Sequence, residues 1–460
     1  MDSVQLAHLL RRTEFIARPA RMTELGQASV TRANAVDNIL DVTTPVALPA
    51  YLDHDIEGEG YEQYVYAIKW WFDRMVDSPK PMQERMAFFW HGHFCSSWDK
   101  VSNTTAMMQQ NKLFRDSALG NFRTMTHAMA IQPAMLYYLD NLDNVKSSPN
   151  QNFARELMEL FTLGVVDQNG APNYTENDVT AAAKAWTGHG IDWDTYTYKF
   201  WPGEHDTGNK TFMGVTKNWD GPDIINHITG NPAVPGSSTA KKMVACKFLT
   251  RKLWEYLAYQ NPAQSLVDQL AQVLYDNDFE IKPWVRALLL RDEFYSQAAT
   301  QGLVRSPVDF VANVFFWSGY RGADLNPQWY VNNMGQLPFV PPNVAGWKTN
   351  GYWINTSLFG SRAEFAQDTA YHLRNPNYNG GAPDPHNVSK NSNGTKRTPA
   401  EAVAAVAALF GFTVADLSAT SYNALLSYAT AQRAAESYVN WWEPTNLLTM
   451  IMTIPEFHTA

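Results

Sequence analysis

The sequence predicts a mainly helical, all-α protein with one small β-hairpin excursion around residues 193–216. Three observations support this fold class. Apolar residues recur at the spacing of an amphipathic helix along most of the 460-residue chain. Strand-like alternation is confined to the one excursion. Hydrophobic residues make up 45% of the chain and charged residues 18%, which is enough apolar material for a large core.

The expected helices follow from this periodicity and from signals at their ends. Pro81 stands near the start of one helix, where the missing N–H of proline costs nothing. Thr175, with Asp178 three residues later, indicates a capped start for another helix, and Gly188 marks its end. The expected helices span residues 4–15, 62–78, 80–95, 151–165, 174–188, 238–258, 263–277, 281–296, 306–320, 398–411 and 422–442.

A further helix is expected to begin at Ser361, within "SLFGSRAEF". This start would place Arg362 in the first turn, where the helix dipole disfavours a cation. The misfit predicts that a carboxylate of the protein or an anionic ligand lies beside Arg362.

Two stretches are expected to be non-helical. Within residues 193–216, the turn sequence "DTGN" at 206–209 is expected to join the two strands of the hairpin. Residues 375–397 are rich in Asn, Gly, Pro and Ser, so they are expected to form a flexible loop excursion, with a lid as the alternative.

The bulk properties of the chain exclude some functions. The net charge of −9 argues against a nucleic-acid-binding protein, because phosphate recognition requires a basic surface. No apolar run is long enough to span a membrane, and the N-terminus lacks the apolar segment of a signal peptide. The chain as given is expected to be cytoplasmic, or exported (periplasmic or extracellular) if a leader was removed. Cys95 and Cys246 either pair in an oxidising compartment or are both buried thiols.

The stretch "QNFARELMELFTLGV", residues 151–165, carries charges among large apolar residues. At about 100° per residue, Glu156 and Glu159 fall on one narrow stripe with Arg155 at its edge. Two carboxylates at this spacing repel each other unless water, a cation or a shared proton relieves them. The stripe is either a set of salt bridges, with Arg155 or Lys210 as partner, or one side of a functional site. We expect the glutamates to face a shared polar site that Arg155 braces.

The stretch "FWHGHF" contains His91 and His93. On a strand both side chains could bind one metal, but on a helix they lie roughly 200° apart. The surrounding sequence predicts an apolar helix, so no metal is assigned to this pair unless Gly92 breaks the helix. One histidine is expected to face a site and the other to lie in the core.

Two loops carry further candidates. "GEHDTGNKTFMG" places His205, Asp206 and Lys210 around a turn, and "PPNVAGW" holds Asn343 and Trp347 in a stiff segment. Loops held by a rigid scaffold often carry chemistry. The alternative for the first loop is that Asp206 forms an Asx turn and that Lys210 is solvated.

Ten stretches, in this order along the chain, resemble a known bacterial family. They are "HLLRRTEF", "FWHGHF", "PAMLYYLDN", "NFARELMELFTLGV", "YTENDVTAAAKAWTG", "HDTGNKTFMG", "FLTRKLWEYL", "LVRSPVDFV", "PPNVAGW" and "IPEFH". The family is DUF1800, which is named for its unknown function. Its usual "FWHNHF" is "FWHGHF" here, and its usual "LGVG" is "LGVV".

The resemblance implies one helical domain over residues 1–460 but supplies no catalytic assignment. Members of the family are often encoded beside DUF1501 proteins, which resemble sulfatases and phosphatases. A DUF1501-type protein is therefore a possible partner for this chain.

The leading functional hypothesis is an enzyme that hydrolyses or eliminates glycans through paired carboxylates in a central polar cleft. Glu156 or Glu159 would supply one carboxylate and Asp206 the other. His91 or His93 would be an auxiliary proton carrier, and His205 is a further catalytic candidate. Trp347 would form a sugar platform. The other candidates for substrate binding are Asp140, Asn141, Arg155, Lys210, Asn343 and Arg362.

Two alternatives remain open at this stage. The first is a metal-dependent hydrolase, which requires His, Asp and Glu side chains to converge from separate segments. The second is a non-catalytic partner or maturation factor for a DUF1501-type protein. The sequence assigns no metal ligand and leaves the cofactor unknown.

Overall fold

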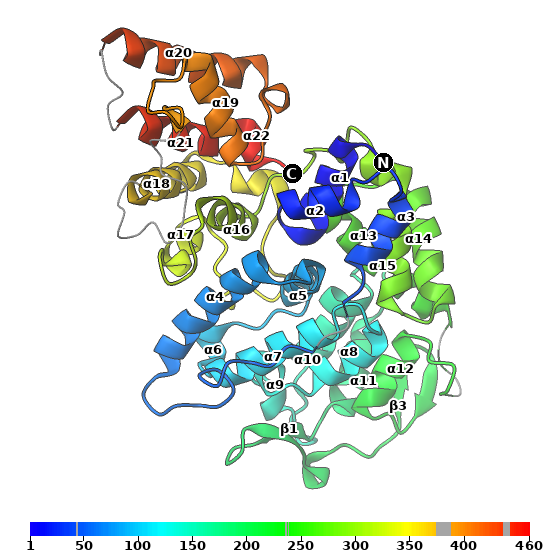
Figure 1. Ribbon diagram of the computed structural model, residues 1–460. Helices are drawn as coiled ribbons and strands as arrows, with labels where there is room; N and C mark the ends of the chain where they lie inside the picture. The colour runs from blue at the N-terminus through cyan, green and yellow to red at the C-terminus, as the bar shows by residue number, and fades with distance from the viewer. Residues whose placement is uncertain (43–44, 235–236, 238, 374–387, 436–441) are drawn as a thin grey trace.

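The computed structural model describes residues 1–42, 45–234, 237, 239–373, 388–435 and 442–460 (Figure 1). Helices account for most of these residues, and the strands form only two small two-stranded sheets, so the predicted mainly helical class is confirmed. No helix in the described ranges is both long enough and apolar enough to cross a membrane.

The first half of the chain is helical up to residue 185. Its α-helices are α1 (Ser3–Glu14), α2 (Pro19–Leu25), α3 (Arg32–Ile39), α4 (Gly60–Asp77), α5 (Pro81–His93), α6 (Trp98–Val101), α7 (Thr104–Asp116), α8 (Phe122–Ala130), α9 (Pro133–Tyr138), α10 (Asn152–Glu156) and α11 (Glu176–Ala185). A π-helix, η2 (Leu157–Thr162), continues directly from α10.

The second half follows the strands. Its α-helices are α12 (Gly221–Ile228), α13 (Thr239–Leu257), α14 (Gln264–Asp276), α15 (Ile281–Leu289), α16 (Pro307–Ser318), α17 (Pro327–Asn333), α18 (Thr356–His372), α19 (Pro399–Leu409), α20 (Ala419–Ala435), α21 (Trp442–Thr453) and α22 (Pro455–His458). Along the whole chain, short 3-10 turns lie between these elements at Asn141–Asp143, Pro202–Glu204, Asp292–Tyr295, Asn350–Trp353 and Val414–Asp416.

The β excursion contains two hairpins rather than the predicted one. β1 (His189–Asp192) pairs antiparallel with β2 (Thr197–Phe200), and β3 (Lys210–Phe212) pairs antiparallel with β4 (Val215–Lys217). The expected turn "DTGN" lies between the two sheets instead of inside a hairpin. The second hairpin turns at residues 213–214, which both have positive φ (46° and 82°) as a two-residue hairpin turn requires.

Helix α5 runs through the centre of the molecule, and each of its residues except Gly92 is buried. It packs against α1, α4 and α7, as Figure 1 shows. The helix nevertheless carries two charges. Glu84 accepts hydrogen bonds from Arg115 Nε and Arg74 Nη2, both at 2.9 Å, and Arg85 Nη1 lies 2.6 Å from Asp309 Oδ1. Buried charges need such partners, so α5 ties several helices together.

The buried apolar side chains form one cluster that extends from Leu6 to Phe457. In Figure 1, α18–α22 form a lobe on one side of the molecule, the hairpins lie at the opposite end, and the two chain ends lie near each other. The two cysteines are buried free thiols, so the disulfide alternative is wrong.

Two predicted segments are only partly described. Of the expected excursion at 375–397, residues 375–387 lie outside the described residues. In the rest, Val388 and Ser389 are buried, residues 392–396 are exposed, and Lys390 and Lys396 form an isolated antiparallel β-bridge. The expected helix at 422–442 matches α20 up to residue 435, and residues 436–441 again lie outside the described ranges.

The capping box predicted at the start of α11 is present, and one of its members has a second role. Asp178 Oδ2 accepts a hydrogen bond from Thr175 N (2.9 Å), while Thr175 Oγ1 accepts one from Asp178 N (3.3 Å). Asp178 Oδ1 also accepts from Met213 N at 2.6 Å, which fixes the second hairpin to this helix.

This double role predicts unequal losses of stability. Thr175→Ala should lower the free energy of unfolding by about 1 kcal/mol, and Asp178→Ala by about 2 kcal/mol, since it also removes the acceptor for Met213. Urea unfolding measures both values. Glu401→Ala in the capping box of α19, whose described bonds all go to Thr398, is the matched control. Equal losses for Thr175→Ala and Asp178→Ala would contradict the second role.

Candidate functional site

The stretch that carries Glu156 and Glu159 is not a continuous α-helix. Leu163 N donates to Met158 O, five residues back, at 2.8 Å, which is the π-helical pattern. Glu156 therefore ends α10 and Glu159 lies in the π-helix, so the angular positions predicted at 100° per residue hold only up to the junction. Single π turns inside helices occur frequently at functional sites.

The two glutamates influence each other electrostatically. Both are half-buried, and Glu159 accepts a hydrogen bond from Tyr174 Oη at 2.9 Å. Burial, and then the charge of Glu159, raise the pKa of Glu156 to about 7, and Arg155 opposes this rise. Arg155 itself binds the two carboxylate oxygens of Glu176 at 2.7 and 2.8 Å. The expected brace is therefore directed at a different carboxylate.

The helical histidines occupy separate, buried positions. α5 continues through His93, as predicted, so His91 and His93 do not share a face. His91 Nε2 accepts a hydrogen bond from Phe339 N at 3.0 Å, and burial lowers its pKa to about 3. His93 Nε2 donates to Phe161 O at 3.0 Å, and burial sets its pKa well below the ordinary value. Both rings are therefore neutral and serve main-chain groups.

The predicted residues Asp140 and Asn141 lie beside the first hairpin. Asp140 forms an ion pair with Lys100 at 2.6 Å. Asn141 is buried, and its Nδ2 donates to His189 O at 2.9 Å and to Trp186 O at 3.3 Å. Asn141 thus fixes the start of β1 in place.

The "PPNVAGW" loop packs against the end of α5. Asn343 is exposed, and its Oδ1 accepts from Ala345 N at 2.9 Å, which stiffens the turn. Gly346 has a φ of +82°, and an added Cβ would lie 2.7 Å from Gly92 O, so only glycine fits this approach. Trp347 is half-buried, with its ring centroid 5.4 Å from that of His91.

The prediction for Arg362 was wrong about the helix. α18 begins at Thr356, where Asn355 caps it by accepting from Leu358 N. Arg362 therefore lies beyond the first turn, and the dipole argument does not apply. The side chain is fully buried, and its Nη2 donates to Arg305 O at 2.8 Å.

Lys210 is not solvated, contrary to the alternative considered from the sequence. The residue is only 4% exposed. Its Nζ donates to the carbonyls of Asp206, Gly208 and Trp219, the last two at 3.0 and 3.1 Å. The predicted Asx turn is present, because Asp206 Oδ1 accepts from Gly208 N at 2.8 Å. The loop is therefore wrapped around one buried ammonium group, which holds His205 in a fixed place.

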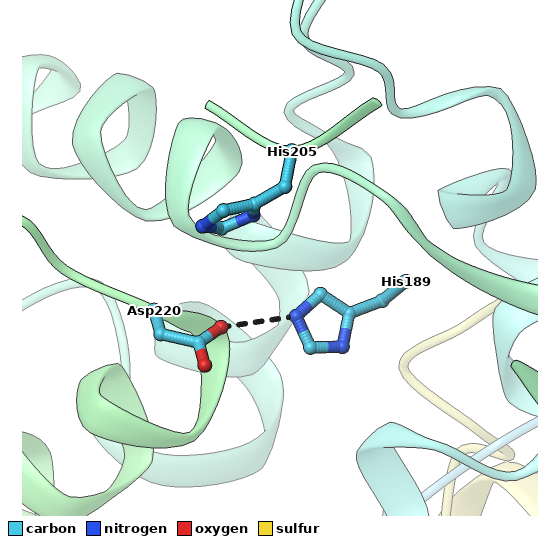
Figure 2. Close-up of side chains that lie close together, drawn as sticks. All are labelled: His189, His205 and Asp220. Carbon is cyan, nitrogen blue, oxygen red and sulfur yellow. Dashed lines mark hydrogen bonds and ion pairs between the residues drawn. The ribbon is translucent and has the colours of Figure 1, made fainter. Parts of the chain in front are cut away.

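His205 meets two residues that the sequence analysis did not single out, His189 and Asp220. Figure 2 shows the three side chains converging from separate segments of the chain. One potential ligand atom from each lies within 4.8 Å of the other two, and among the described residues this is the one such group of His, Cys, Asp or Glu. We refer to these residues as the histidine cluster.

Hydrogen bonds orient each ring of the histidine cluster. His205 Nδ1 lies 2.8 Å from Thr187 O, which only an N–H can satisfy, so in the neutral ring Nε2 is the atom that carries the lone pair. His189 Nε2 lies 3.1 Å from Asp220 Oδ1, and its Nδ1 lies 2.9 Å from Tyr198 Oη. Burial acts to raise the pKa of Asp220, but the hydrogen bond and charge of His189 hold it below the ordinary value.

The local backbone explains why these residues meet. Gly188 has a φ of +79°, and an added Cβ would lie 2.7 Å from Trp201 O. Glycine therefore allows the segment that directly follows β2 to pack against the start of β1. Trp201 N donates to Gly188 O at 2.8 Å and closes this contact. Asp220 caps α12 and so stands where that helix begins, beside the hairpin.

A pocket of about 210 Å³ lies next to the histidine cluster and includes His189 in its wall. Glu204, Trp193 and Trp201 also line it. The two tryptophans are 63% and 42% exposed, which is high for such large apolar rings. Exposed aromatic rings beside a polar pocket provide a stacking surface for a ring-bearing ligand.

The role of Lys210 predicts a large effect of its removal. Lys210→Met should lower the free energy of unfolding by about 3 kcal/mol, because it leaves buried carbonyls without a donor. Lys217→Met, on the same hairpin and in a partly exposed ion pair with Asp223, is the matched control and should have little effect. Thermal and urea unfolding measure both. A loss for Lys210→Met no larger than for the control would contradict the buried role.

The raised pKa of Glu156 predicts a pH-dependent stability. A carboxyl whose pKa is higher in the folded than in the unfolded state loses stability as pH rises from about 4.5 to about 7. Glu156→Gln mimics the protonated acid, so it should stabilise the protein at pH 8 and have little effect near pH 5. Unfolding at several pH values checks this. When Glu159 is also replaced by Gln, the stabilisation by Glu156→Gln at pH 8 should be smaller. A stabilisation that is equal at all pH values would contradict a raised pKa of Glu156.

The sequence was compared with protein families, curated proteins and solved structures. No curated protein and no solved structure gave a match. One family model, described as a protein of unknown function (DUF1800), matches residues 8–459, nearly the whole chain. The resemblance noted in the sequence is thereby confirmed, and the chain belongs to the DUF1800 family.

Proposed function

We propose that this protein is a metal-dependent hydrolase whose metal ligands are His189, His205 and Asp220, and that its substrate is a glycan. The observation that carries the proposal is the bond from His205 Nδ1–H to Thr187 O, which leaves Nε2 free to bind a metal beside the other two residues. Metal-binding histidines are commonly oriented by a main-chain carbonyl in this way.

The cluster is compatible with the size of a zinc site. Ligand atoms about 2.1 Å from a zinc ion lie about 3.4 Å apart in a tetrahedron. The three candidate atoms lie within 4.8 Å of one another, so small side-chain rotations would bring them to one ion. His189 is 3% exposed, whereas the side chain of Asp220 is 52% exposed. The cluster is therefore enclosed on one side and open on the other, which leaves room for a water or substrate ligand.

A metal held in this way would lower the pKa of a bound water and polarise the bond to be cleaved. Glu204 precedes His205 in the chain and lines the adjacent pocket, so it is placed to act as general base. Trp193 and Trp201 would bind a sugar ring by stacking.

This assignment fits the charges better than the paired-carboxylate hypothesis does. That mechanism needs one carboxylate from Glu156 or Glu159 and a second from another segment, and Asp206 was the expected second one. Asp206 instead forms an Asx turn and lies 3.7 Å from the ammonium group of Lys210. The charges that act on Glu156 are those of Glu159 and Arg155. Catalysis at Glu156 stays a prediction, and the histidine cluster is the stronger candidate.

The first test is the metal content of protein purified without chelator and then equilibrated with zinc. Wild-type protein should hold about one zinc per chain, and His205→Ala should bind at least about tenfold more weakly. His54→Ala, which removes an exposed histidine outside the cluster, is the matched control and should bind like wild type. Equal zinc binding by His205→Ala and wild type would refute the ligand assignment.

The second test is turnover of a panel of oligosaccharides. Chelator should abolish hydrolysis and added zinc should restore it. Glu204→Gln should lower kcat at unchanged zinc content, and Trp201→Ala should raise KM. Hydrolysis that survives chelation, or that Glu204→Gln leaves intact, would refute the assigned roles.

A further inference from the structure

A second polar site lies in the centre of the fold, away from the hairpins. Arginines from the start of the chain, from α5 and from the segment before α16 surround a small pocket of about 60 Å³. The charged residues that line it are Arg11, Arg12, Arg85, Arg305, Glu255 and Asp309. We refer to it as the arginine pocket.

Three of these arginines are buried almost completely. Arg12, Arg85 and Arg305 are 7%, 5% and 3% exposed. Burying a cation is costly unless it is paired and hydrogen-bonded. Arg85 has such a partner in Asp309, at 2.6 Å.

In the described structure Arg12 and Arg305 bond only to main-chain oxygens and form no ion pair with a side-chain carboxylate. Arg12 Nη2 donates to Ala460 O, and Arg305 Nε donates to Thr459 O at 3.1 Å. Carbonyl oxygens satisfy N–H groups but do not neutralise a cation. Consistent with this, burial and the neighbouring arginines lower the pKa of both guanidinium groups to about 9.

Several buried donors have no acceptor. Within the described residues, Arg12 Nε, Arg85 Nε and Arg305 Nη1 are buried and lack a hydrogen-bond partner. Natural proteins rarely leave buried donors unsatisfied, and each one requires an explanation such as a ligand or an ion. Guanidinium groups with free N–H donors bind carboxylate and phosphoryl oxygens well, because the two geometries match.

Positive charge exceeds negative charge in this pocket. Four arginines face the two acids Glu255 and Asp309. Behind the lining, Arg362 adds a cation through its bond to Arg305 O, and Asp416 adds an anion that acts on Arg11. A carboxylate at Ala460 would supply one negative charge and still leave an excess of cations. An anionic group in the pocket would remove this imbalance.

A larger pocket of about 210 Å³ adjoins the arginine pocket and shares Phe88, Glu255, Tyr256, Gln336 and Thr349 with it. We refer to it as the aromatic pocket. Its other walls include Phe89, Trp347 and Lys252. An anionic head among the arginines would thus continue into an apolar, aromatic space.

We propose that the two adjoining pockets together bind a small organic anion. Its carboxylate or phosphoryl oxygens contact Arg12, Arg85 and Arg305, and its apolar or aromatic body lies against Trp347. Four of the stretches that match the family pattern line this site: "HLLRRTEF", "LVRSPVDFV", "FLTRKLWEYL" and "PPNVAGW". The proposal is independent of the metal-site proposal.

The test is calorimetric titration of the full-length protein with phenyl phosphate and with phenylacetate. EDTA in the buffer keeps the histidine cluster from binding either probe through a metal. At least one probe should bind saturably with Kd below about 1 mM, and the preferred probe tells phosphoryl from carboxylate recognition. No saturable binding of either probe would overturn the proposal and make the arginines a purely internal network.

Variants locate the binding. Arg305→Gln should raise the Kd of the preferred probe at least about tenfold, since it removes a buried charged donor. Arg286→Gln, which removes an exposed arginine paired with Asp37, is the matched control. Trp347→Ala keeps the test decisive if Arg305→Gln fails to fold. Trp347→Ala should raise the Kd of the preferred probe while leaving any binding of inorganic phosphate unchanged. Wild-type affinity in folded Arg305→Gln or in Trp347→Ala would overturn the site.

Discussion

The rest of this structure depends on the burial of α5 together with its polar groups. A helix enclosed on all sides is normally apolar. This one carries Glu84, Arg85, His91 and His93, and each of them has to find a partner on another segment. Glu84 takes Arg74 from α4 and Arg115 from α7, and Arg85 takes Asp309 from α16. The need to pair Glu84 and Arg85 therefore fixes how these helices pack around α5.

The two histidines of α5 extend the same constraint to loops. His91 binds the main chain before the "PPNVAGW" segment, and His93 binds Phe161 O at the end of the π-helix. The last carbonyl groups of a helix have no hydrogen-bond donor within that helix. His93 supplies a donor for one of them. The central helix thus determines the walls of the aromatic pocket and the geometry of the segment that carries Glu159.

Much of the fold could be predicted because helical periodicity and capping are local properties of the sequence. The capping box of Thr175 and Asp178 needed no tertiary information. Errors arose where a local rule was applied beyond its range. A helical spacing of 100° per residue does not hold beyond Leu157, because the hydrogen-bond pattern changes there. The start of α18 was predicted too late in the chain, because Asn355 caps the helix at an earlier residue. The burial of Lys210 depends on tertiary wrapping, which no window of sequence shows.

The site residues were predictable to different degrees for the same reason. His205 was identified because its loop is rich in polar residues. His189 and Asp220 were not, because their approach depends on hairpin register, on Gly188 and on the bonds that Asn141 makes. Most of the arginines of the arginine pocket lie in stretches that match the family pattern, but their amphipathic spacing is also typical of a solvent-exposed helix face. Only the packed structure shows that they are buried together.

Lys252 connects the central pocket with the π-helix. Lys252 lines the aromatic pocket, and its Nζ lies 3.5 Å from Leu160 O, the carbonyl next to the one that His93 binds. Burial lowers the pKa of Lys252 to about 8. A hydrogen bond of 3.5 Å is weak. The lysine therefore retains donors that an anion in the pocket can use, and any such anion acts on a cation that also contacts the segment bearing Glu159. The proposed ligand site therefore contacts the π-helix that bears Glu159 through the side chain of Lys252.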